Sequence, residues 1–203
     1  MTGWITDLVT DLGYVGLALL TFIENVFPPI PSEIIMPLGG FLVAEGELSL
    51  LGVVLAGTLG SVAGSLVFYF LGWQFRRDRL REWVGRHGRW LLLTVDDVEK
   101  AYGWFDRHGR AAVFLGRLIP GVRSLISLPA GSSAMRLGPF LLYTALGTAI
   151  WSAALAYGGM LLGDQYERLS RLLQQATYVV IALLLLVIAR WIVQRVRRRQ
   201  EID

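Results

Sequence analysis

The chain has 203 residues, of which 54% are hydrophobic and only 17% are charged, and its mean hydropathy is +0.53. A soluble domain carries roughly 25% charged residues, so this composition argues against a soluble globular enzyme. The sequence has no cysteine, which excludes a disulfide framework, a thiolate metal site and a cysteine nucleophile, and its net charge is +3. The apolar residues gather into blocks, which indicates a single polytopic, all-α integral membrane domain.

The first apolar block, at residues 13–44, is interrupted. It contains four prolines and two acids, namely Pro28, Pro29, Pro31, Pro37, Glu24 and Glu33. Three prolines within four residues break a helix, because each lacks an N–H donor and restricts the preceding residue. The arms at about 13–27 and 32–44 are too short to cross a bilayer, which takes about 20 residues. We therefore predict a re-entrant hairpin that turns at Pro28 and Pro31, and such a break indicates a buried or water-lined site.

An uninterrupted apolar run at 50–73 predicts the first transmembrane helix. The region that follows, 74–110, is predicted to be an interfacial loop on the cytoplasmic side, with an amphipathic helix at 97–108. Residues 80–93 have a similar but less regular pattern and form either a second such helix or a solvated loop. Residues 1–75 contain no Lys or Arg, whereas residues 76–110 carry nine basic residues. By the positive-inside rule this loop is cytoplasmic, so the basic residues reflect topology and do not indicate nucleic acid binding.

The two histidines, His87 and His108, both lie in this loop and are 21 residues apart. They lack metal-ligand spacing and have no nearby acid and nucleophile. We interpret them as exposed loop histidines, and we expect no metal, no cofactor and no catalytic residue.

A second interrupted block covers residues 111–135. Its arms meet at Pro120 and Gly121, and Arg117 and Arg123 lie on either side of the break. By the same reasoning we predict a second re-entrant hairpin. Two further transmembrane helices are predicted, at 138–163 and 174–194, and the five basic residues from Arg190 onward place the C-terminus in the cytoplasm.

The two interrupted blocks resemble each other in spacing. Gly39 follows Pro28 by eleven residues, and Gly131 follows Pro120 by eleven. Each unit, at about 13–73 and 109–163, is a hairpin plus one spanning helix, so the second unit starts on the opposite face of the membrane. The repeats are therefore predicted to be inverted, an arrangement that points to a transporter binding site at the two breaks.

Four ionisable residues are predicted to lie at membrane depth: Glu24, Glu33, Arg117 and Arg123. Each costs about 2.5–3.5 kcal/mol to insert, so such groups are usually paired and functional. The two acids lie in one hairpin and the two bases in the other. They could form a static salt bridge, or an anion site in which arginine binds phosphate oxygens and a carboxylate exchanges a proton.

The spanning segments contain two pairs of small residues, Gly60 with Gly64 and Gly159 with Gly163. Such pairs allow close helix packing within a chain or between two copies. We favour packing within one chain, and a homodimer remains open.

Three segments carry a family likeness: FIENVFPPIPSE at 22–33, FLGRLIPGVR at 114–123 and PAGSSAM at 129–135. Over residues 13–163 the chain resembles the DedA family, whose members contain the VTT or SNARE-associated domain. The resemblance implies a bacterial inner-membrane protein that recycles polyprenyl phosphate or translocates or scrambles phospholipids. It also implies functional roles for Glu24, Glu33, Arg117 and Arg123. Some members have Asp in a Pro-Gly-Asp context where this chain has Pro-Ser-Glu, which keeps the charge.

These observations predict a lipid transporter, or flippase, for undecaprenyl phosphate or a related phospholipid, with protons or sodium as the coupling ion. Arg117 and Arg123 would bind the phosphate, while Glu24 and Glu33 would hold the arginines and carry protons. Two alternatives remain open. One is a proton-coupled exporter of small cations or drugs, and the other is a membrane scaffold that transports nothing.

Overall fold

The computed structural model describes residues 3–27, 32–91, 95–120 and 122–163, together with single positions between 175 and 190. Its helices are α1 (Gly3–Leu12), α2 (Tyr14–Val26), α3 (Ser32–Ala44), α4 (Leu50–Gln74), α5 (Arg77–Leu91), α6 (Val95–Arg117), α7 (Ser127–Ser132) and α8 (Leu137–Leu162). No strand occurs in these ranges, so the all-α prediction is confirmed for them. The predicted helix at 174–194 lies outside the continuously described residues.

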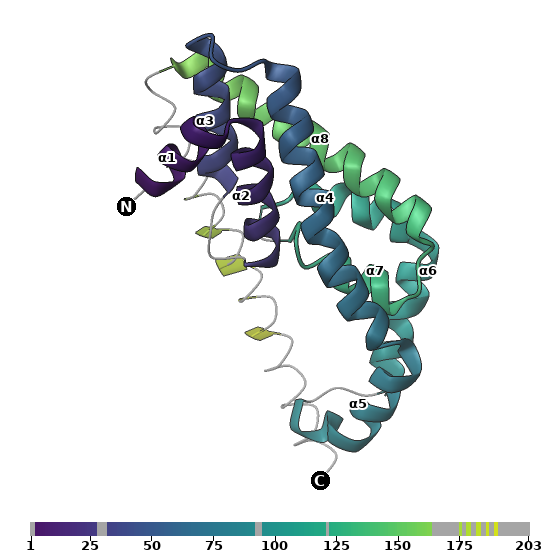
Figure 1. Cartoon of the computed structure of the whole chain (residues 1–203). Coiled ribbons are helices and arrows are strands. Elements are labelled where there is room, and N and C mark those ends of the chain that lie inside the picture. Colours follow the sequence, from purple (N-terminus) through teal and green to yellow (C-terminus); the bar gives the residue numbers. More distant parts are fainter. Residues whose placement is uncertain are drawn as a thin grey trace.

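The two longest apolar helices, α4 and α8, pass each other along the middle of the molecule (Figure 1). They have 25 and 26 residues, and both are long and apolar enough to cross a membrane. At 1.5 Å per residue each is about 38 Å long, which exceeds the bilayer core of about 30 Å. They correspond to the spans predicted at 50–73 and 138–163.

The shorter helices pack on α4 and α8 in a crossed pattern. In the N-terminal half α2 lies along α4, whereas α3 lies along α8. In the C-terminal half α6 lies along α8, whereas α7 lies along α4. The first helix of each half thus packs on the long helix of its own half, and the second helix packs on the long helix of the other half.

Glycines make the crossed contacts possible. A Cβ atom at Gly40 of α3 would lie 1.9 Å from the backbone oxygen of Ala156, and one at Gly131 of α7 would lie 1.9 Å from that of Tyr69. Glycines of the long helices make contacts of the same kind. At Gly159 a Cβ would lie 2.1 Å from the carbonyl oxygen of Pro37. Backbones that approach so closely leave no room for any side chain at these glycines.

The small-residue pairs noted in the sequence have different surroundings. Gly60 and Gly64 of α4 both face the backbone of α2, and Gly159 faces α3, as expected for packing within one chain. Gly163, at the end of α8, has open space around it, because no described atom lies within 4 Å of an added Cβ.

The first interrupted block folds as predicted on both sides of its break. Helices α2 and α3 have 13 residues each and begin and end close to the predicted arms at 13–27 and 32–44. Pro28 and Pro31, the predicted turn, lie outside the described residues. At 1.5 Å per residue either helix reaches only about 20 Å, so neither could cross a bilayer by itself.

The region between the halves and the second hairpin both differ from the prediction. Helices α5 and α6 cover most of residues 74–110, so the stretch 80–93 is helical as far as Leu91. The helix predicted at 97–108 lies within α6, which runs without interruption to Arg117. No proline lies between Val95 and Arg117, so nothing ends the amphipathic helix at residue 108 or 110. The predicted second arm is also shorter than expected. Residues 118–120 and 122–126 form turns and bends, and only the six residues of α7 are helical.

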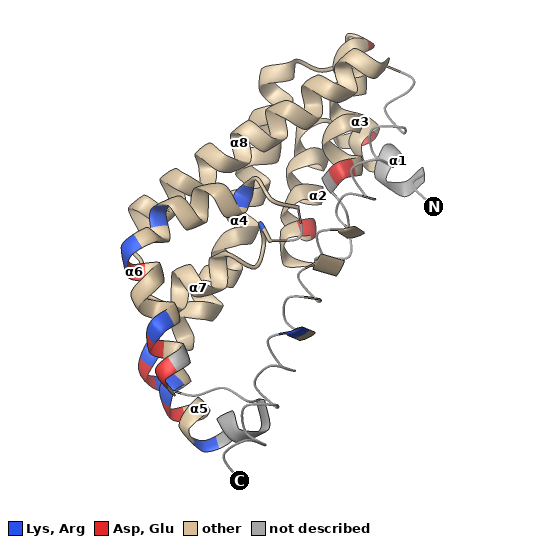
Figure 2. Cartoon of the chain, turned by 180° about the vertical axis from the view of Figure 1, so that it is seen from behind, with Lys and Arg blue, Asp and Glu red and all other residues tan. Residues whose placement is uncertain are grey.

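The charged residues concentrate at one end of the molecule. Figure 2 shows Lys, Arg, Asp and Glu gathered on α5 and the adjoining part of α6, while the long helices are largely uncharged. Arg77 pairs with Glu99 at 3.1 Å and with Asp106 at 3.3 Å, which ties α5 to α6. The connection between α3 and α4 lies at the opposite end (Figure 1). This polarity follows the charge pattern of the sequence.

Candidate functional site

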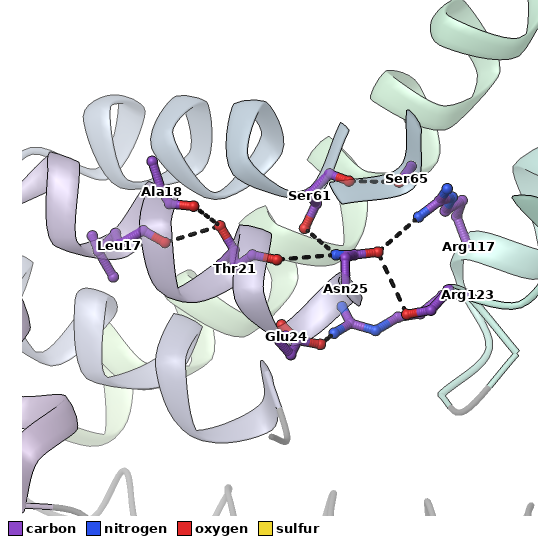
Figure 3. A network of polar contacts seen from close by, with 10 residues as sticks. Leu17, Ala18, Thr21, Glu24, Asn25, Ser61, Ser65, Arg117 and Arg123 are labelled. Carbon is purple, nitrogen blue, oxygen red and sulfur yellow. Dashed lines mark hydrogen bonds and ion pairs between the residues drawn. The ribbon is translucent and has the colours of Figure 1, made fainter. Parts of the chain in front are cut away.

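A buried polar cluster lies where the two halves of the chain meet. The C-terminal turn of α2 supplies Glu24 and Asn25, and the end of α6 supplies Arg117. The turns after α6 supply Arg123 and Ser124. Figure 3 shows the side chains of Glu24, Asn25, Arg117 and Arg123 pointing toward one another, with Ser61 and Ser65 of α4 beside them. The structure therefore brings three of the four predicted ionisable residues together.

Arg123 and Glu24 form an ion pair between Nη2 and Oε1. Both residues are buried, with 8% and 4% of their surface exposed. The second oxygen of Glu24, Oε2, has no hydrogen-bond partner among the described residues. The carboxylate is thus only partly satisfied, and breaking such a buried pair by removing one partner costs about 3–5 kcal/mol.

Arg117 is more deeply buried than Arg123, at 2% exposure, and no carboxylate pairs with it in the described part of the chain. Its guanidinium donates from Nη2 to Ser127 Oγ at 2.7 Å and from Nη1 to Asn25 Oδ1 at 3.3 Å, while Nε has no described partner. Both acceptors are uncharged. The cluster therefore holds two buried guanidinium groups and one paired carboxylate, which leaves an excess positive charge.

Asn25 links the three parts of the cluster. Its Nδ2 donates to Ser61 Oγ on α4 at 3.0 Å and to the carbonyl oxygen of Thr21 at 3.2 Å. Its Oδ1 accepts from Arg117 at 3.3 Å and from Ser124 Oγ at 3.4 Å. The amide thus meets donors on one side and acceptors on the other, which fixes its orientation.

Glu33, the fourth predicted residue, lies in the first turn of α3 and is 3% exposed. A carboxylate at this position is favoured by the helix dipole. The hydrogen bonds of the cluster join Ser61, Arg117 and Ser124 to Asn25, and the ion pair joins Arg123 to Glu24. Of the predicted turn residues, Pro120 lies in the turn after α6, and Gly121 is outside the described residues.

A stripe of buried hydroxyl groups on α8 passes the cluster. Thr144, Thr148 and Ser152 are spaced four residues apart and therefore share one face of the helix. Gly147 lies beside this stripe and faces Arg117, since a Cβ there would stand 2.8 Å from the Arg117 Cβ. The hydroxyls of Thr144 and Thr148 have no hydrogen-bond partner among the described residues. Unsatisfied buried donors of this kind are suited to water or to a polar ligand.

Asn25, Ser61 and Ser127 were missed by sequence reasoning, as were the hydroxyls of α8. The available signal was weak. Polar residues recur at intervals of four in the otherwise apolar spans, at Ser61 and Ser65 and at Thr144 and Thr148. This spacing places them on one helix face. Burying one serine or threonine in an apolar helix costs little free energy, so such residues are common there and do not by themselves indicate a site.

The family assignment rests on comparison with known proteins. The VTT domain model matches residues 30–161 of the sequence. The chain belongs to this family. It is a DedA-family membrane protein, as the three sequence motifs indicated, and its relatives are bacterial membrane proteins. No solved structure matches the chain.

Three relatives illustrate the range of names in the family. The chain is 45% identical to an alkaline phosphatase-like protein of Lactococcus lactis over 181 residues, which cover 89% of this chain and 85% of that one. It is 30% identical to undecaprenyl phosphate transporter A of Staphylococcus aureus over 198 residues, 98% of each chain. With the Bacillus subtilis protein of the same name it shares 32% identity over 189 residues, 93% of this chain and 91% of that one.

Proposed function

We propose that this protein translocates undecaprenyl phosphate, or a related phospholipid, across the bacterial cytoplasmic membrane. The observation that carries the proposal is the excess positive charge of the buried cluster, where Arg117 has no carboxylate partner among the described residues. Two relatives named as undecaprenyl phosphate transporters support the choice of a lipid phosphate. Two planar guanidinium groups can bind the oxygens of one phosphate through charge-assisted hydrogen bonds.

The crossed packing supports an inverted repeat as the framework of transport. In each half a short helix packs on the long helix of its own half, and a second packs on the long helix of the other. Helices α2 and α3 are each too short to cross the bilayer, as expected for the arms of a re-entrant hairpin. The charged cluster lies at the break of both halves, which is where inverted-repeat transporters bind their substrates.

In this mechanism the phosphate competes with Glu24 for Arg123. When the phosphate binds Arg123 and Arg117, the carboxylate of Glu24 loses its cation and takes up a proton, because an unpaired charge is costly in a buried site. Release of the lipid restores the ion pair and returns the proton. Glu33, also buried, is the second candidate for proton transfer. The lipid tail stays in the bilayer, so only the head group has to enter the cluster.

The proposed orientation places α5 and the adjoining part of α6 in the cytoplasm, and the connection between α3 and α4 on the outer face. This orientation follows from the positive-inside rule, because residues 76–110 carry nine basic residues and residues 1–75 carry none. Under this orientation the α2–α3 hairpin opens outward and the α6–α7 break opens inward, as alternating access requires.

The proposal is tested with purified protein in liposomes that contain labelled polyprenyl phosphate, beside liposomes with labelled phosphatidylethanolamine. We expect faster movement of the polyprenyl phosphate and a large loss in Arg123→Lys, because lysine keeps the charge but not the planar fork. Arg86→Lys is the matched control, since Arg86 is an exposed residue paired with Glu82. Unchanged lipid movement in a folded Arg123→Ala protein would refute the assignment. Proton flux without lipid movement would favour the exporter of small cations.

A further inference from the structure

A second pocket lies away from the Glu24–Arg123 cluster, where α6 passes the turn between α7 and α8. Its volume is about 550 Å³, and its walls come from residues 105–111, residues 133–136 and Pro139. Four of the lining residues are basic or can become so: Arg107, His108, Arg110 and Arg136. This pocket has no part in the transport mechanism proposed above.

The positive charge of the pocket is not neutralised by its own walls. Asp106 is the one acidic residue that lines it, and its Oδ2 already accepts from Nη1 of Arg77 at 3.3 Å. Arg110 and Arg136 are exposed and have no carboxylate partner in the described part of the chain. Arg107 uses only its Nε, which donates to the carbonyl oxygen of Gly103 at 2.9 Å. Guanidinium groups from α6 and from the α7–α8 turn therefore remain available to one ligand.

The backbone adds donors beside these arginines. Helix α8 begins at Leu137, and the preceding Arg136 provides no side-chain cap. The first amides of α8 therefore keep their hydrogen-bonding capacity, and the helix dipole favours an anion there. The turn that delivers Arg136 is held by Ala134 in the left-handed region, at φ 52, and by Met135 N–H, which donates to the Ala130 oxygen at 3.1 Å. A non-glycine residue in this conformation costs free energy, so the surrounding contacts must hold the turn in place.

The position of the pocket indicates its depth in the membrane. It adjoins the first turn of α8, which is the end of a candidate span. Trp104 of α6 is exposed, and its ring stacks on His108 of the pocket with 5.3 Å between ring centroids. Exposed tryptophans concentrate at the level of lipid head groups. A cationic pocket at this level meets the phosphates of the bilayer.

We propose that this pocket binds the phosphate group of an anionic phospholipid, held by Arg110 and Arg136 from the two walls. The recognised group is a phosphate, which a lipid or free inorganic phosphate could supply, and the depth of the pocket favours the lipid. An arginine-rich pocket on α5 gives a contrast. Its arginines have acids within the same helix, such as Glu82, which pairs with Arg86 at 3.3 Å.

The test measures binding of phosphatidylglycerol and phosphatidylcholine to the full chain in neutral detergent, by native mass spectrometry titration. The double variant Arg110→Gln/Arg136→Gln should bind phosphatidylglycerol about thirtyfold more weakly, since each basic residue near a membrane surface contributes roughly five- to sixfold. Arg79→Gln/Arg86→Gln removes the same charge from the α5 pocket and should bind as the wild type does. In an Arg123→Gln background, adding Arg110→Gln/Arg136→Gln should weaken phosphatidylglycerol binding by the same factor, which separates the pocket from the transport site.

Equal losses in the two double variants, or none in either, would overturn the proposal. The variant Arg110→Lys/Arg136→Lys keeps both charges and serves if the glutamine variant unfolds. It should retain binding that depends on salt. Inorganic phosphate is added as a competitor in a separate arm. Displacement of the lipid by millimolar phosphate would assign the site to free phosphate and overturn the lipid as its ligand, whereas continued lipid binding would support the proposal.

Discussion

The side chain of Arg117 lies against Gly147 of α8. A Cβ atom at position 147 would stand 2.8 Å from the Arg117 Cβ and 2.9 Å from the backbone oxygen of Phe114. Helices α6 and α8 can therefore hold the buried guanidinium in place only because position 147 has no side chain. The contact connects the long helix of the second half directly to the charged cluster.

Gly147→Ala should displace Arg117 and lower lipid transport strongly, with a loss of stability of about 1–3 kcal/mol from overpacking. Gly103→Ala is the control, because an added Cβ there meets no described atom within 4 Å and alanine favours a helix. Transport rates in liposomes and unfolding in detergent measure both effects. Equal transport rates and equal stabilities in the two variants would mean that the Arg117–Gly147 contact does not contribute to transport.

Glu24 should tolerate loss of its charge better than loss of its side chain. Glu24→Ala leaves Arg123 buried and unpaired, at a cost of about 3–5 kcal/mol. Glu24→Gln reproduces the shape of a protonated glutamate, retains an acceptor for Arg123, and should cost less than half of that. It should also abolish the pH dependence of transport, which is measured as translocation rate against pH. If glutamine destabilises as much as alanine, Glu24 is a fixed counter-ion and carries no proton.

Asn25→Asp tests the excess charge of the cluster. The carboxylate would accept from Arg117 and Ser124 as the amide oxygen does, but it would neutralise the charge that the phosphate needs. Its second oxygen could not donate to the Thr21 carbonyl oxygen as Nδ2 does, so we expect a folded but less stable protein with little or no transport. Asn25→Ala removes the hydrogen bonds to Arg117 and Ser124 without adding charge. It should lose about 1–3 kcal/mol of stability while retaining affinity for the lipid phosphate. The opposite order of lipid affinities in these two variants would contradict the anion-site model.

Neighbouring glycines of α3 should differ sharply in their tolerance of alanine. At Gly40 a Cβ would lie 1.9 Å from the Ala156 backbone oxygen, so Gly40→Ala forces α3 away from α8. At Gly39 the added atom meets the side chains of Val53 and Leu17, at 2.8 Å and beyond, and these can rearrange. Thermal unfolding in detergent should show a larger drop for Gly40→Ala. A larger drop for Gly39→Ala would contradict the described packing of α3.

The absence of native cysteines allows a direct test of orientation. Single variants Glu47→Cys and Glu82→Cys place thiols at opposite ends of the molecule, in the α3–α4 connection and on α5. A thiol reagent that cannot cross the membrane should label position 47 in intact spheroplasts and position 82 only after lysis. Labelling of both from the same side would refute the proposed topology.

The sequence predicts the arms of the first hairpin and the spans at 50–73 and 138–163 well, because prolines and hydropathy act locally. It also predicts that Glu24, Arg117 and Arg123 meet, since buried charges need partners. It does not predict Asn25 as their link, because an amide costs little in an apolar helix and its partners come from α4 and from the turns after α6. The register of the repeat depends on tertiary contact as well. Spacing alone equated Gly39 with Gly131, whereas the glycine of α3 in backbone contact with a long helix is Gly40.

The crossed packing of α3 on α8 has a consequence for how the protein is made. Helix α3 ends at Ala44, but the surface it covers belongs to a helix that begins at Leu137. When α3 leaves the ribosome, α8 has not been synthesised. The surface of α3 around Gly40 therefore stays unpacked, in the bilayer or at the translocation machinery, until α8 is made. Neither half can complete its packing alone. Two separately expressed halves, divided between α5 and α6, would each insert incompletely and should assemble only when both are present in one membrane.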